Sequence, residues 1–186
     1  DVPVVFKTEI ETLLRLHRHQ VDFRKAYLSY NAGNWDSTLV YSMRQIKRSS
    51  HDIKIADYCH YFSAISFRNK KLLEQAKQEL DKISPNVTFG HAVDLTFGQI
   101  ALEQGHFEKA LTCFEKVNNR PTFSKDFDNG ALYHNIGVCY FHMGKYNEAQ
   151  KYLFKAAGLQ ENERDTTMLV TSYMDIANLY YEQFKD

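Results

Sequence analysis

The sequence lacks the features that mark nucleic-acid-binding or membrane-spanning proteins. Its 186 residues carry 23 lysines and arginines against 23 aspartates and glutamates. It therefore has no basic excess with which to displace counterions from phosphates. No apolar run approaches the roughly 20 residues that span a bilayer. We expect neither nucleic-acid contacts nor a membrane span in this chain.

Cysteine is also scarce. Cys59, Cys113 and Cys139 form no CxxC pair and are odd in number, so no disulfide framework is expected. Unpaired cysteines slightly favour a reducing compartment such as the cytoplasm, and a periplasmic location stays open for an exported fragment. The chain begins at Asp1 without a methionine, which is consistent with a mature fragment or an excised domain.

Motifs for catalysis and for metal or cofactor binding are missing. The eight histidines form no HExxH motif and no cluster with cysteines. The sequence contains no P-loop, no GxGxxG and no GxSxG. We therefore expect no catalytic residues, no metal site and no cofactor.

Only three prolines interrupt the chain, and strand patterns are negligible. Apolar residues recur at three-and-four spacing from Ala131 to Met143 and from Tyr146 to Ala157, which is the period of amphipathic helices. Pro85 and Pro121 fall in short connectors between such stretches. The sequence predicts an all-α fold of about nine helices in antiparallel pairs.

The helical stretches follow one repeated template. A small residue is followed by a glycine seven positions later, an aromatic two further on and an alanine three beyond that. The two clearest copies are Gly98, Gly105, Phe107 and Ala110, and Gly137, Gly144, Tyr146 and Ala149. The small residue lets the partner helix approach closely, and the second glycine ends the first helix in a left-handed conformation. Weaker copies place Ala64 and Ala177 at the small position.

This pattern resembles the tetratricopeptide repeat (TPR) family. The residues that fill its motif best are Tyr133, Ile136, Gly137, Tyr140, Ala149, Leu153 and Ala156. The resemblance implies a right-handed α-solenoid, with residues 1–186 as a single domain. Its units would cover residues 20–50, 51–85, 89–120 and 128–160, with a half unit at 166–186. The long repeats and the linker at residues 158–167 also resemble repeat regions of bacterial signalling proteins, including sensor kinases and transcription regulators.

The resemblance also implies a binding surface, because the first helix of each TPR unit lines the concave side. We call this set the predicted concave strip: Tyr58, Tyr61, Ile65, Arg68, Leu95, Gln99, Leu102, His134, Val138, Phe141, Met174, Asn178 and Tyr181. The strip is largely apolar, as binding surfaces often are. The alternative is that flanking sequence or a longer first helix already fills the groove.

These features favour a non-catalytic protein- or peptide-binding domain, the regulatory or sensory module of a larger signalling protein. Two alternatives stay open: the regulatory fragment of an enzyme such as a sensor kinase or protease, and a receptor for a short signalling peptide. The final half unit lacks its second helix. We therefore expect the natural protein to continue past Asp186, or this end to pack on another copy.

Overall fold

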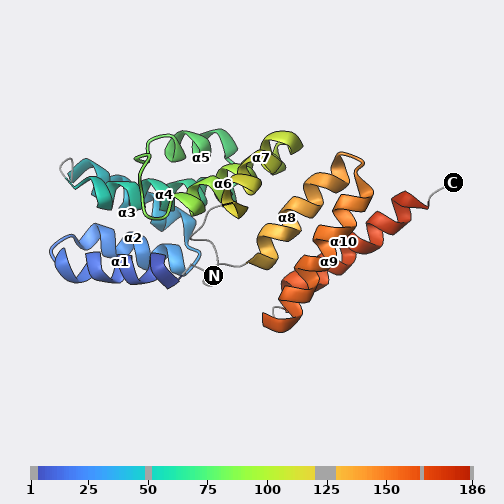
Figure 1. The fold of residues 1–186 in the computed structure, drawn as a ribbon. Coiled ribbons are helices and arrows are strands. Elements are labelled where there is room, and N and C mark those ends of the chain that lie inside the picture. The colour runs from blue at the N-terminus through green and yellow to red at the C-terminus, as the bar shows by residue number, and fades with distance from the viewer. Residues whose placement is uncertain (1–3, 49–51, 120–128, 164–165, 185–186) are drawn as a thin grey trace. The chain divides into compact units, whose positions relative to one another are not determined.

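The computed structural model describes residues 4–48, 52–119, 129–163 and 166–184, and every regular element in those ranges is an α-helix (Figure 1). The helices are α1 (Val4–Leu16), α2 (Val21–Asn31), α3 (Trp35–Arg48), α4 (Ile53–Asn69), α5 (Leu73–Leu80), α6 (Gly90–Glu103), α7 (Phe107–Asn118), α8 (Asn129–His142), α9 (Tyr146–Glu163) and α10 (Thr166–Gln183). The all-α prediction is confirmed. The described residues contain ten helices rather than about nine, because α1 precedes the first predicted unit.

The first helix of a pair ends four times in the same turn. In each turn one N–H bonds the carbonyl three residues back, and the next N–H bonds the carbonyl five residues back, at distances of 2.8–3.1 Å. The first of these N–H groups belongs to Gly33, Lys71, Gly105 and Gly144 respectively, and all four residues have positive φ. This is the Schellman ending of a helix. The predicted left-handed glycines at Gly105 and Gly144 are confirmed, and Lys71 adopts the same conformation with φ 61°.

The chain divides into two compact units, Val2–Ile100 and Ala101–Asp186, which we describe separately. The first unit has a continuous apolar core formed by α1, α2, α4, α5 and α6. Helix α1 supplies Phe6, Ile10 and Leu13 at helical spacing, and all three are buried. Helix α1 lies outside the predicted repeat units, although its apolar period is visible in the sequence.

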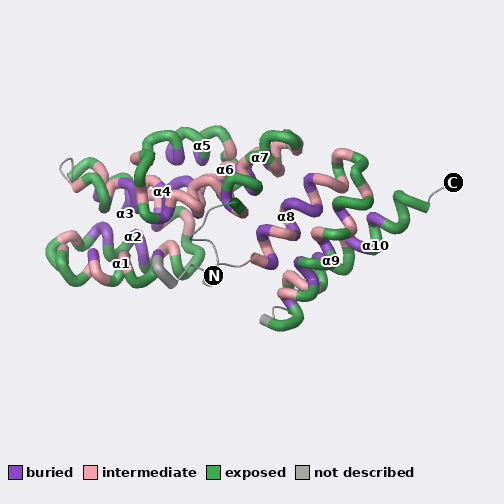
Figure 2. The backbone as a smooth tube through the Cα atoms, in the orientation of Figure 1, coloured by how far each residue is buried: buried purple, intermediate pink, exposed green. Residues whose placement is uncertain are grey.

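In the unit Ala101–Asp186, α9 packs between α8 and α10. One buried apolar cluster there comprises Ala149, Leu153, Ala157, Ile176 and Leu179, and Leu132 and Ile136 of α8 are also buried. Figure 2 shows mostly buried and half-buried backbone along α8, whereas α10 is largely exposed. No helix in the described part of the chain is both long and apolar enough to cross a membrane.

Candidate functional site

The structure buries the beginning of the predicted concave strip. Tyr58 and Tyr61 are 1% and 8% exposed. The ring of Phe6 in α1 lies edge-on to both, with centroid distances of 5.1 and 5.4 Å. Phe89 covers them further, stacked on Tyr58 at 4.4 Å. The expectation that these two tyrosines line an open groove is therefore wrong, because flanking residues fill the space in front of them.

The next strip residues, on α4 and α6, are half-buried and bonded to each other. Arg68 donates a hydrogen bond from Nη1 to Oε1 of Gln99, with an N–O distance of 2.6 Å. Burial raises the pKa of the Tyr61 and Tyr30 phenols, and the nearby positive charge of Arg68 only partly offsets this increase. Ile65, Leu95 and Leu102 are also half-buried. These residues of α4 and α6 therefore expose less side-chain surface to a ligand than the predicted concave strip implies.

The last part of the strip lies on α8 and α10 and is more open. His134 is buried, and its Nε2 lies 2.8 Å from Oδ2 of Asp175 on α10. Val138 and Phe141 are half-buried beside the core of this unit. On α10, Met174 and Tyr181 are 62% and 67% exposed.

We call this surface the α8–α10 face and define it as His134, Val138, Phe141, Met174, Asn178 and Tyr181. Both sets of three recur at i, i+4 and i+7, so each occupies one side of its helix. The His134–Asp175 contact joins the two helices. The face therefore combines exposed apolar side chains with a bonded polar pair on two neighbouring helices.

A pocket of about 360 Å³ lies in the unit Val2–Ile100 and was not anticipated from the sequence. We call it the α1–α4 pocket, because Glu9 of α1 and Lys54, Asp57 and Tyr58 of α4 form part of its wall. Residues 84–89, which connect α5 to α6, complete it, together with Ile53. Its wall residues are far apart in the sequence, so no local motif reveals the pocket.

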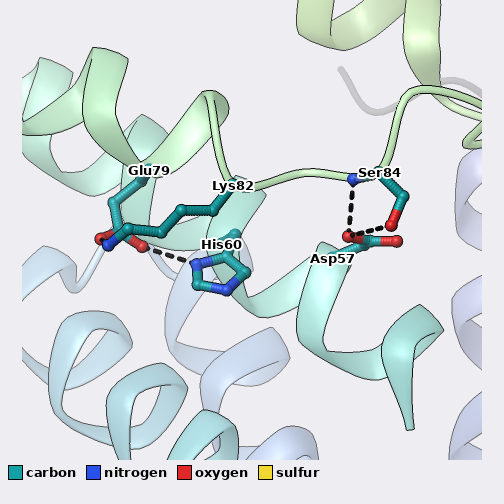
Figure 3. Close-up of polar contacts among 5 residues, drawn as sticks. All are labelled: Asp57, His60, Glu79, Lys82 and Ser84. Carbon is teal, nitrogen blue, oxygen red and sulfur yellow. Dashed lines mark hydrogen bonds and ion pairs between the residues drawn. The ribbon is translucent and has the colours of Figure 1, made fainter.

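Next to the pocket, α4 and α5 are joined by a polar cluster (Figure 3). His60 Nδ1 lies 2.8 Å from one oxygen of Glu79, and Lys82 Nζ lies 2.6 Å from the other. Burial raises the pKa of the Glu79 carboxyl, but the bonds from His60 and Lys82 outweigh it, and the net pKa is lowered. This cluster fixes α5 against α4. Within the described ranges, no group of three or more His, Cys, Asp and Glu residues is arranged to hold a metal ion.

Comparison with known proteins identifies the repeat. A sequence profile of the tetratricopeptide repeat matches residues 130–163, which contain almost all of α8 and the whole of α9. A comparison with curated protein sequences finds no match. Residues 130–163 are thus similar to a tetratricopeptide repeat, and the chain has the fold of TPR-like solenoid proteins.

Solved structures support this fold at low sequence identity. PlcR of Bacillus thuringiensis, solved with the peptide PapR7 and DNA, is 12% identical with a TM-score of 0.68. The match covers 91% of this chain and 64% of PlcR, so this chain spans less than two thirds of that protein. BtubC (BKLC) of P. vanneervenii is 15% identical with a TM-score of 0.67, over 93% of this chain and 78% of BtubC. A putative kinesin light chain TPR-like repeat protein of Podosopora anserina is 12% identical with a TM-score of 0.61, over 88% and 85% of the two chains.

Proposed function

We propose that this chain is a non-catalytic recognition domain that binds a protein or peptide through the α8–α10 face. TPR-type folds stack helix pairs into extended binding surfaces and are typically non-catalytic. The observation that carries the proposal is the exposure of Met174 and Tyr181 on α10, the helix that the His134–Asp175 hydrogen bond joins to α8. Large apolar side chains grouped on a surface commonly mark a binding site.

The ligand would place its own apolar side chains against Met174 and Tyr181. The half-buried ring of Phe141 would lose its remaining contact with water on binding, as the central residues of interfaces do. His134 is already bonded to Asp175, so it would hold α10 in place rather than anchor the ligand. In this proposal Phe141 and Tyr181 bind the ligand, and the His134–Asp175 hydrogen bond positions α10.

Within this function, we propose that the domain is the regulatory or sensory module of a larger signalling protein. A receptor for a short signalling peptide is the second candidate. The fold likeness to PlcR, a protein solved with a bound peptide, favours that candidate. A regulatory fragment of an enzyme would use the same face, and finding a catalytic domain in the full-length gene would identify it.

A displayed library of short peptides, selected on the purified domain, tests the proposal directly. Affinities of the selected peptides are then measured by fluorescence anisotropy for the wild type and for Phe141→Ala, Met174→Ala and Tyr181→Ala. Because hot-spot aromatics carry much of the binding energy, Phe141→Ala and Tyr181→Ala should each cost about 2 kcal/mol. Equal affinities for all variants, or no selected peptides, would contradict the proposal.

Phe154→Ala is the matched control. Phe154 is an aromatic of similar size, 46% exposed on α9 and outside the α8–α10 face. It should leave peptide affinity unchanged. The C-terminal end of the chain was also expected to pack on a second copy of the chain. Light scattering against protein concentration tests that self-association.

A further inference from the structure

The α1–α4 pocket has the size and the mixed lining of a ligand site. Its volume of about 360 Å³ falls within the usual range for small-molecule pockets. The apolar part of its wall consists of Ile53, Tyr58, Pro85, Val87 and Phe89. Against this apolar wall stand two carboxylates, one from α1 and one from α4.

The first carboxylate belongs to Asp57, which is only 4% exposed. Its Oδ1 accepts hydrogen bonds from the backbone N–H and the hydroxyl of Ser84, at 2.9 and 3.2 Å. Both bonds go to the same oxygen of the Asp57 carboxylate (Figure 3), and its second oxygen accepts no hydrogen bond from the described residues. Because Asp57 lines the pocket, its second oxygen is an acceptor that a ligand in the pocket can use.

The second carboxylate belongs to Glu9. Its Oε2 accepts hydrogen bonds from the hydroxyls of Tyr58, at 2.8 Å, and of Thr88. These neutral donors leave the charge uncompensated. Neither Glu9 nor Asp57 forms an ion pair within the described part of the chain, and Lys54, the one lysine in the wall, is exposed and does not bond them.

We infer that the α1–α4 pocket binds a ligand that carries a protonated primary amine next to an apolar group. The ammonium would bond the free oxygen of Asp57 and the carboxylate of Glu9, because charge-assisted hydrogen bonds are the strongest available there. The apolar group would lie against Tyr58 and Phe89. The amino end of a peptide and a free hydrophobic amine share this chemistry. The inference is independent of the α8–α10 face, which belongs to the other unit.

Isothermal titration calorimetry on the full chain tests the site with three probes. These are L-leucinamide, a Leu-Gly-Gly peptide with a free amino end, and N-acetyl-L-leucinamide, which keeps the apolar group but has no charge. The first two should bind the wild type, and the acetylated probe should not. Tighter binding of the peptide than of leucinamide would identify an amino end of a peptide as the ligand, and equal binding would identify a free amine.

The matched protein variant is the double substitution Glu9→Gln and Asp57→Asn. Both amides keep a carbonyl oxygen for Tyr58 and Ser84, so circular dichroism should show an intact fold while the charge is lost. Affinity for the amine probes should fall by about tenfold or more. Asp81→Asn is the control, because Asp81 is an exposed carboxylate just after α5. It should leave the affinity for the amine probes unchanged.

The inference is overturned if neither amine probe binds the wild type, or if the acetylated probe binds equally well. Unchanged affinity in the double variant would also overturn it. If the double variant does not fold, the comparison of charged and acetylated probes on the wild type still decides. Loss of peptide binding at the α8–α10 face leaves these results unaffected, so the two proposals can fail separately.

Discussion

Gly137 faces Leu153 so closely that a methyl group on Gly137 would lie 2.8 Å from Cγ and 2.9 Å from Cδ2 of Leu153. The backbone nitrogen of Leu153 would be 3.2 Å away. The absence of a side chain at Gly137 therefore sets the distance between α8 and α9. This is the close crossing predicted from the repeat template.

Replacing Gly137 by alanine should destabilise the protein by about 1–3 kcal/mol, because the new methyl group overpacks the crossing. Gly137→Leu should cost more. Urea unfolding followed by circular dichroism measures both. Gly158→Ala is the control: it lies in α9 with nothing within 4 Å of the added carbon, so the better helix former should raise stability by about 0.5–1 kcal/mol. Equal changes at the two glycines would show that the crossing is wrongly placed.

Replacing Tyr61 by alanine should cost about 3–5 kcal/mol, as for other large buried aromatics. Tyr61 belongs to the predicted concave strip, but it is 8% exposed and lies against Phe6 and Phe89. Thermal unfolding measures the loss. Tyr181→Ala removes the same side chain from a position that is 67% exposed and should change stability by no more than about 0.5 kcal/mol. A small effect at Tyr61 would mean that α1 does not cover it.

The lowered pKa of Glu79 predicts a pH-dependent contribution to stability. Burial raises the pKa of this carboxyl, but the hydrogen bonds from His60 and Lys82 lower it by more than burial raises it. The folded state therefore favours the charged form. A lowered folded pKa gives stability that is fully present above the unfolded value of about 4.3 and lost as pH falls through the folded value. The difference in melting temperature between the wild type and Glu79→Gln should therefore shrink in acid.

Glu108→Gln is the control for this pH series, because Glu108 is an exposed carboxylate on α7. Its melting temperature should follow that of the wild type at every pH. A wild-type advantage over Glu79→Gln that grows in acid would contradict the assignment of charge to Glu79.

The buried thiols should resist chemical modification. Burial raises the pKa of the Cys139 thiol to about 12 and raises that of Cys59 even further, so little thiolate forms at neutral pH. In the folded protein, Cys113 should react with a disulfide reagent well before the other two, because it is half-buried rather than buried. Absorbance measures the reaction, and Cys113→Ser should abolish the fast phase. Equal rates for all three thiols would contradict this burial.

The sequence predicted those parts of the fold that depend on local pattern. The helices around Gly137 and the turns at Gly105 and Gly144 could be anticipated because side-chain size and backbone conformation act at single positions. The docking of α1 could not, since the period of Phe6 and Ile10 shows an amphipathic helix but not its target. The covering of Tyr61 was missed for the same reason.

In the candidate sites too, features set by local sequence pattern could be predicted and features set by tertiary packing could not. The predicted strip located the exposed residues of the α8–α10 face, because helical spacing alone places Met174 and Tyr181 on one side of α10. The His134–Asp175 contact joins residues 41 positions apart. The carboxylates of Glu9 and Asp57 meet in one pocket only after α1 has docked. Pairings of this kind depend on tertiary packing and leave no local signal.

Lys71 shows what is being repeated in this chain. It occupies the left-handed turn that glycine occupies in the three equivalent places, with the same pair of backbone hydrogen bonds. A lysine tolerates this conformation at a cost of about 1–2 kcal/mol, which the surrounding helix pair can absorb. The periodic unit is thus a backbone geometry, and amino-acid identity is one of several ways to encode it. Repeat boundaries in divergent chains can accordingly be located from hydrogen-bond topology where signature residues have been replaced.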